Sequence, residues 1–227
     1  MKNVVLISSP LQALVFWLIF NTNHKFQNED FLIFIEDGYK LPQHPKLEYK
    51  YIASTRGNNF DAIRDNLNLI NDEVTHDVIL WISDLLWPMN NACYTMLLKE
   101  ENLYKVIFFD EGMVMYWQEK LNIYRFFKEI FKFTLYRFKH SIKFIYPSKM
   151  LFYNNRKNGT VYAIHPNLLK YNKDIQKIII RDIDIDTFRN NLDKDINFSH
   201  PVFNSNSSTA LFLSQPFYRV TDIDNFK

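Results

Sequence analysis

The sequence predicts an α/β protein built on a Rossmann-like parallel sheet with flanking helices. Strand-like apolar runs alternate along the chain with segments whose apolar residues recur at helical spacing. Several runs are apolar throughout, which is typical of strands that are covered on both faces. The expected strands cover residues 3–7, 30–35, 47–52, 77–82 and 105–109. Because ligands of such sheets bind beyond the carboxyl ends of the strands, functional residues are expected directly after them.

Helices are expected between these strands. They cover residues 10–20, 59–71 and 89–98. Ser9 is suited to cap the first helix, and Pro10 stands at its first position, where a missing N–H is harmless. An interruption at residues 8–12 leaves the N-terminal apolar segments well short of the ~20 residues that a bilayer span requires. A strand followed by a buried helix is therefore expected there.

The amino-acid composition limits the classes of function that the chain can have. With 47% hydrophobic and 23% charged residues, the chain belongs with ordinary globular proteins. A formal net charge of +2 gives no argument for nucleic acid as a partner. The single cysteine, Cys93, excludes an internal disulfide and fits a reducing compartment, so a cytoplasmic location is expected.

Residues 119–143 contain seven Lys/Arg against two Glu, interleaved with aromatic residues, and a long helix is expected there. Three interpretations stay open. The aromatic side chains pack on the domain, or the segment binds an anionic membrane peripherally at the inner face of the cytoplasmic membrane. Binding to nucleic acid is the least favoured, because no nucleic-acid module accompanies the segment.

The C-terminal part predicts a domain boundary. A turn at residues 154–159 precedes short strands at 160–164 and 178–180, and a polar stretch ends in a linker-like run at 204–208. A new buried-type strand follows at 209–216. Residues 1–208 are therefore expected to form one domain, and 209–227 the truncated start of a second.

Three segments carry a resemblance to a known family. They are Ile-Ser-Ser-Pro-Leu-Gln-Ala-Leu at residues 7–14, Phe-Phe-Asp-Glu-Gly at 108–112 and Leu-Phe-Leu-Ser-Gln-Pro at 211–216. In their order and spacing they resemble the bacterial sialyltransferases of glycosyltransferase family 52 and the related capsular polysialyltransferases. The resemblance implies the N-terminal, acceptor-side domain of a two-domain GT-B glycosyltransferase.

The resemblance also implies an activity. Such an enzyme transfers sialic acid from CMP-sialic acid to a lipooligosaccharide or capsule, inverting the anomeric carbon without a metal ion or other cofactor. The family's donor-binding His-Pro and Ser/Thr-rich motifs belong to the C-terminal domain, and this sequence contains neither after residue 216. The chain alone is therefore expected to be inactive.

The candidate catalytic residues follow from the middle motif. An inverting transfer needs a base that takes the proton of the acceptor hydroxyl, and the resemblance assigns that role to Glu111. Asp110 would orient the loop, and Gly112 would let substrate approach the backbone closely. The alternative is an acidic turn that only ends a strand.

The candidate substrate-binding residues of the first turn are Ser8, Ser9 and Gln12, where backbone N–H groups at a helix start suit polar or anionic ligands. The alternative is that Ser9 merely caps the helix. The histidines are scattered without metal-ligand spacing, so no metal site is expected.

Two other functions remain possible on the sequence. The chain could be a non-enzymatic, truncated remnant that folds as one Rossmann-like domain. It could also be another GT-B transferase or a generic nucleotide-binding α/β module.

Overall fold

The computed structural model describes residues 1–36, 41, 43–55, 57, 59–74, 77–85, 87–110, 123–145, 158–163 and 176–179. All of them belong to a compact unit over Met1–Ile196. The domain boundary expected near Ser208 and the strand expected at 209–216 lie outside the described residues.

The described strands form one parallel sheet in the order β3-β2-β1-β4-β5-β6-β7. Their bounds are β1 Lys2–Ile7, β2 Phe31–Glu36, β3 Leu47–Ile52, β4 Val78–Ile82, β5 Leu103–Phe109, β6 Asn158–Ala163 and β7 Gln176–Ile179. The predicted Rossmann-like α/β class is confirmed. The strand order reverses between β1 and β4, which is the topological switch point where such sheets bind ligands.

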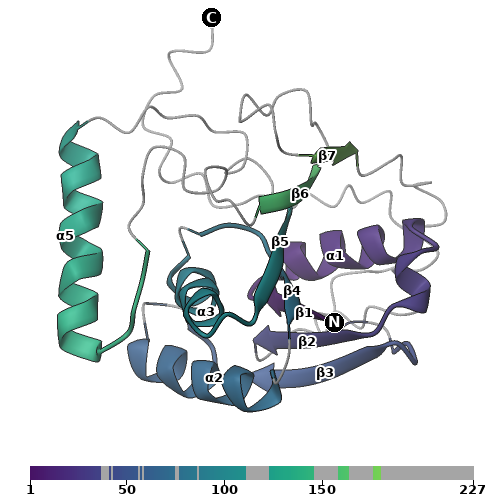
Figure 1. Ribbon diagram of the computed structural model, residues 1–227, viewed down its shortest axis with the longest axis horizontal. Coiled ribbons are helices and arrows are strands. Elements are labelled where there is room, and N and C mark those ends of the chain that lie inside the picture. The colour runs from purple at the N-terminus through teal and green to yellow at the C-terminus, as the bar shows by residue number, and fades with distance from the viewer. Residues whose placement is uncertain are drawn as a thin grey trace, which may run out of the picture. The chain divides into compact units, whose positions relative to one another are not determined.

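Helices cover both faces of the sheet (Figure 1). On one face lies α1 (Pro10–Thr22), followed by the 3-10 turn η1 (Phe26–Asn28), which the sequence did not predict. On the other lie α2 (Phe60–Glu73) and α3 (Pro88–Lys99). The fourth described helix, labelled α5, spans Ile123–His140.

Two predicted boundaries are wrong. The helix expected over 119–143 ends at His140, because Ser141 adopts a left-handed backbone (φ 58°) and residues 141–145 are not helical. The turn expected at 154–159 is cut short, since β6 already begins at Asn158. Residues 154–157 lie outside the described part of the chain.

The core lies in two layers, one on each face of the sheet. In β1, Val4 and Leu6 join the layer under α2 and α3, whereas Val5 and Ile7 join the layer under α1. Successive side chains of a strand point to opposite faces, so a strand covered on both sides must be apolar at every position. This explains why central strands such as β2 and β4 read as nearly continuous apolar runs, whereas β3 at the edge of the sheet carries Glu48 and Lys50.

The chain beyond α5 is fastened to α3 by Asn91, which is fully buried. Its side-chain amide donates to the carbonyl oxygen of Ile145 (3.0 Å), and the Ile145 N–H donates back to Asn91 Oδ1 (2.9 Å). Asn91 also donates to the carbonyl of Leu85 (3.0 Å). The buried ring of Phe133, from α5, packs on Phe144 with centroids 5.3 Å apart. Residues 141–145 therefore connect α5 to the core.

Candidate functional site

The turn between β1 and α1 opens the carboxyl edge of the sheet. Ser9 is the N-cap of α1, with an extended backbone (φ −148°), and its Oγ accepts from the Gln12 N–H at 3.2 Å. Pro10 occupies the first helical turn, as predicted. The capping role of Ser9 is thus confirmed: its hydroxyl accepts from one of the backbone N–H groups that have no partner within the helix at a helix start.

Gln12 ties this turn to the neighbouring strand. Its Oε1 accepts from the N–H of Ser8 (2.7 Å) and from the Ser8 hydroxyl (3.1 Å). Its Nε2 donates to Ser83 Oγ, directly after β4, at 3.0 Å. The side chain is buried, with the residue only 2% exposed. Gln12 therefore positions the turn across the switch point, and it does not present its amide to solvent as a direct sugar contact would.

The end of β4 continues the same network. Besides the bond from Gln12, Ser83 Oγ accepts from Asn90 Nδ2 (3.4 Å) and donates to Asp84 Oδ2 (3.3 Å). The other carboxylate oxygen of Asp84 accepts from the N–H of Trp87 (2.8 Å), which fixes the turn into α3. The half-buried Asp84 is thus held at the switch point with its geometry set by neighbours.

In the described part of the chain, three acidic residues lie at this edge. Asp110 directly follows β5 and is fully buried; Ile82 of β4 pairs with Phe108 of β5, so Asp84 and Asp110 follow their strands at equivalent positions. Glu36 is the last residue of β2 and is also buried. Its carboxylate accepts from the hydroxyls of Ser54 (3.1 Å) and Thr55 (2.5 Å). The edge therefore gathers carboxylates and hydroxyls from several neighbouring strands.

The sequence placed some of these residues correctly. Asp110 lies at the carboxyl end of a strand, as predicted, and at the same edge as the Ser9 turn, with β4 between the two. Glu111 and Gly112, the other residues of that motif, lie outside the described residues.

Sequence reasoning missed Glu36, Ser83, Asp84 and Asn90. A signal for two of them was present: the apolar runs of β2 and β4 lead into Glu36 and Asp84 just as the run of β5 leads into Asp110. An acidic residue that ends an apolar run is at the ligand-binding edge whenever the run is a parallel strand.

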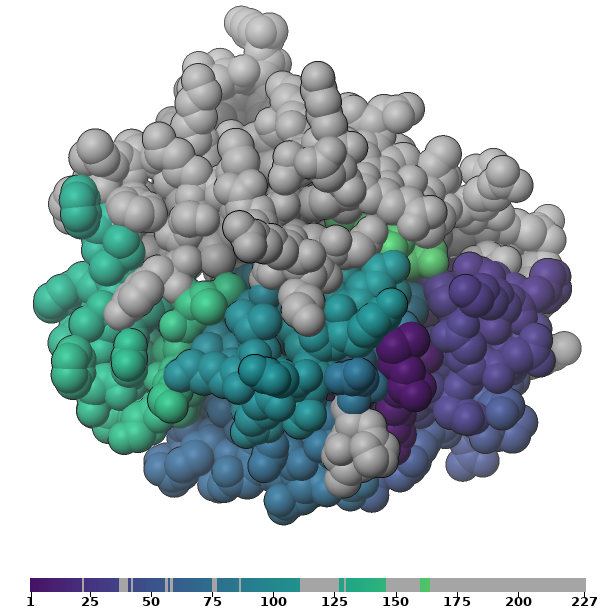
Figure 2. Space-filling view, viewed as in Figure 1, coloured from purple at the N-terminus to yellow at the C-terminus, as the bar shows by residue number. Residues whose placement is uncertain are grey.

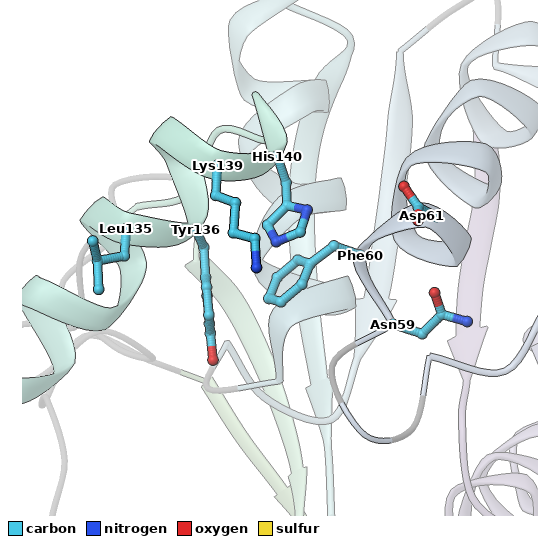
Figure 3. Close-up of a pocket in the computed structure, with 7 residues that line it drawn as sticks. All are labelled: Asn59, Phe60, Asp61, Leu135, Tyr136, Lys139 and His140. Carbon is cyan, nitrogen blue, oxygen red and sulfur yellow. The ribbon is translucent and has the colours of Figure 1, made fainter.

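A pocket of about 550 Å³ lies where the start of α2 meets the last turns of α5 (Figure 3). The His140 ring stacks on Phe60 with centroids 4.2 Å apart and planes at 19°, and Tyr136 contacts the same ring at 4.2 Å. The residues that line the pocket are Asn59, Phe60, Asp61, Leu135, Tyr136, Lys139 and His140. Aromatic walls with a few polar groups are typical of small-molecule sites.

Two further findings concern the described residues alone. No group of three or more His, Cys, Asp or Glu side chains among them is arranged to hold a metal ion. None of the described helices combines the length and apolarity that crossing a membrane would take.

The parallel sheet, its strand order and its polar carboxyl edge define the chain as a Rossmann-like α/β protein. Comparison with models of known protein families and with the sequences of curated proteins finds no significant match. The class therefore rests on the fold, and the function must be argued from the site.

Proposed function

We propose that this chain is the acceptor-side domain of a glycosyltransferase of the sialyltransferase type, with sugar transfer at the carboxyl edge of the sheet. The observation that carries the proposal is the half-buried carboxylate of Asp84 at the switch point, which Ser83 and the N–H of Trp87 hold in place and which lies after β4, next to the end of β5. A sugar acceptor offers several hydroxyl groups, and carboxylate and hydroxyl oxygens are suited to accept their hydrogen bonds.

In this proposal Glu111 is the base. It removes the proton from the acceptor hydroxyl while that oxygen attacks the anomeric carbon of sialic acid and the bond to CMP breaks, which inverts the configuration at that carbon. The resemblance of residues 108–112 to the family motif supports this assignment. Asp110, buried directly before it, would fix the loop that carries the base.

The other edge residues take supporting roles. Gln12 holds the end of β1 to the end of β4 through Ser8 and Ser83, so substrate would meet a turn of fixed shape. A preorganised site avoids rearrangement during the reaction. The pocket between α2 and α5 offers the aromatic faces and polar groups with which a further sugar of the acceptor could be held.

The proposal predicts that the chain binds acceptor and that Glu111 acts on it. In saturation-transfer NMR, the purified chain should bind oligosaccharides ending in an acceptor sugar, with galactose and sialic acid as the first termini to test. Joined in one polypeptide to the donor-binding domain of a bacterial sialyltransferase, it should transfer sialic acid. Glu111→Gln should then slow transfer by about 10²–10⁴-fold, the usual contribution of a general base, with CMP-sialic acid still bound.

A matched control is Asp72→Asn, which also removes one carboxylate charge but lies in the last turns of α2, exposed and away from the strands' carboxyl ends. It should leave both binding and transfer unchanged. Binding of nucleotides without oligosaccharides would instead indicate a generic nucleotide-binding module. Binding of neither would indicate a non-enzymatic remnant, and an unaltered rate in Glu111→Gln would remove the base from this position.

A further inference from the structure

α5 carries an exposed apolar stripe. Phe127, Phe131, Leu135 and Phe138 are exposed by 61%, 65%, 49% and 81%. Their spacing of four, four and three residues places them along one side of an α-helix. The buried Phe133 and the half-buried Tyr136 belong to the opposite side, which packs on the core. Packing on the core therefore explains the aromatic residues on one side of the helix and leaves those of the exposed stripe unexplained.

The stripe lies on the surface of the molecule. α5 is set at the left of Figure 1 as a separate rod beside the sheet and its covering helices, and Figure 2 shows its atoms forming the outer left flank. Single exposed apolar residues are common on protein surfaces. A row of them along one helix is instead typical of a surface that contacts a membrane or another protein.

Cations accompany the stripe. Lys128, Lys132 and Lys139 each directly follow one of its phenylalanines, so they form a parallel row on one flank. The Lys132 ammonium lies 5.7 Å from the centroid of the Phe133 ring. In sequence, α5 contains five Lys/Arg and one Glu.

A second group of cations stands beside the last turn of α5. Lys99 of α3, Arg137 of α5 and Lys143 converge there. Close contact with Lys143, some loss of hydration and the nearby charge of Arg137 lower the pKa of Lys99. Like charges held together in this way are stabilised by an anionic partner.

We propose that α5 is a membrane-docking helix that lies on an anionic lipid surface. The stripe of Phe127, Phe131, Leu135 and Phe138 would enter the boundary between headgroups and acyl chains, and the lysine row would contact the lipid phosphates. A helix with an apolar face of this kind and Lys/Arg beside it is the type that binds in the plane of a membrane.

The charges decide between a membrane and a second copy of this chain. In a two-fold symmetric contact two copies of α5 would meet, each with five Lys/Arg and one Glu, so like charges would predominate at the contact and repel. An anionic bilayer instead accepts the apolar side chains and neutralises the cations together. The occupant that fits both features is the membrane.

The docking surface is independent of the proposed catalytic chemistry, although the two are neighbours. Leu135 and Lys139 of α5 also line the pocket at the start of α2. If the proposed function holds, docking would bring the acceptor side of the protein to a glycolipid at the membrane surface.

The test is co-sedimentation of the full chain with vesicles, one set of phosphatidylglycerol and phosphatidylethanolamine and one of phosphatidylcholine. The unaltered chain should partition to the anionic vesicles and leave them as salt rises. The triple variant Phe127→Ser, Phe131→Ser, Phe138→Ser should lower the partition coefficient by ~10-fold or more. Lys128→Gln with Lys132→Gln and Lys139→Gln should lower it by roughly 100-fold, since each cation contributes about fivefold near an anionic surface.

The matched control is Tyr51→Ser with Tyr104→Ser, which removes aromatic side chains that are each 56% exposed on β3 and β5. It should bind vesicles like the parent, and circular dichroism should be the same for every variant. Equal and negligible binding to both vesicle types would overturn the proposal. So would a concentration-dependent dimer in analytical ultracentrifugation that the Phe→Ser variant abolishes. Neither assay depends on sugar transfer, so docking can fail while the proposed function stands, and the reverse.

Discussion

Tyr94 brings a hydroxyl group into the core without a hydrogen bond to any described residue. Its side chain is fully buried on α3, and its hydroxyl has no hydrogen-bond partner within the described structure. The same burial raises the pKa of Tyr94 to about 12. A buried hydroxyl that makes no hydrogen bond loses its hydration without compensation.

Tyr94→Phe should therefore stabilise the protein. Removing the hydroxyl relieves a desolvation cost of about 1–3 kcal/mol, partly offset by the small space that it vacates, so we expect a net gain of about 1 kcal/mol in urea unfolding. Tyr162→Phe is the comparison, because the Tyr162 hydroxyl is hydrogen-bonded to Asn23. That change should lose about 1 kcal/mol. Destabilisation by Tyr94→Phe would mean that the hydroxyl has a partner, such as a bound water.

For single residues, the sequence predicted the position at a strand end or helix start more reliably than the role of the side chain found there. Ser9 and Asp110 were found because a cap and a strand end are local patterns. The bond from Gln12 to Ser83 joins positions 71 residues apart, and no local pattern predicts which polar side chains meet across such a distance. The structure shows that Gln12 ties the turn to the end of β4, and the contact with substrate that the sequence analysis assigns to it stays a prediction.

At the level of helices and strands, the side chain of Asn91 joins α3 to residues 141–145, which follow α5. Asn91 presents its amide to the backbone of Ile145 as a neighbouring strand would, with one donated and one accepted bond. The fully buried Asn91 also holds the carbonyl of Leu85. If this side chain is shortened, the carbonyls of Leu85 and Ile145 lose their donor, whereas the N–H of Ile145 still has Thr95 Oγ1 at 3.1 Å as an acceptor.

We expect Asn91→Ala to reduce the free energy of unfolding by about 2–4 kcal/mol, because buried backbone groups left without partners cost about 1–3 kcal/mol each and water can reach some of them. Hydrogen exchange should rise at residues 141–145 first. Asn71→Ala, at an exposed position of α2, is the control and should change stability by less than about 0.5 kcal/mol. Unchanged exchange at 141–145 would show that Phe133 and Phe144 hold this connection without Asn91.

The elements also show why the helix at α5 was harder to interpret than the strands. Strands in the middle of this sheet, such as β2 and β4, are apolar on both sides, and their predicted limits lie within one residue of the observed ones. In α5 aromatic residues occur on the core side and on the exposed side, as Phe133 and Phe138 illustrate. The sequence predicted a helix and left its surface role open for that reason.

For the whole molecule, the ionisable groups buried in the core predict sensitivity to alkali. Burial raises the pKa of Cys93 from 9.0 to about 12, with a smaller contribution from Glu100, and raises that of Tyr162 from 10.0 to about 12. Burial also raises the pKa of Tyr49, with a smaller effect of Tyr51. In each case the folded protein keeps a proton that the unfolded chain releases as pH rises.

The contribution of these groups to stability should consequently be constant below about pH 8.5, and stability should fall between about pH 9 and 12. Each such group contributes a slope of up to about 1.4 kcal/mol per pH unit once the pH exceeds its pKa in the unfolded chain. Urea midpoints measured from pH 7 to 11 would show the decline. The Cys93 thiol should also resist alkylation at pH 8 until urea unfolds the chain. A constant urea midpoint up to pH 11, or rapid alkylation of the native protein, would contradict this account.

The position of β1 has a consequence for how the protein is made. Of the described strands, β1 comes first in the sequence and leaves the ribosome before the others, yet it pairs with both β2 and β4. Its pairing with β4 must wait until Trp81, which partners Val5, has been synthesised. At about 5–20 residues per second this is an interval of roughly 4–15 seconds in which an apolar strand has an open edge. During that interval the nascent chain is a natural client for chaperones that bind extended apolar segments.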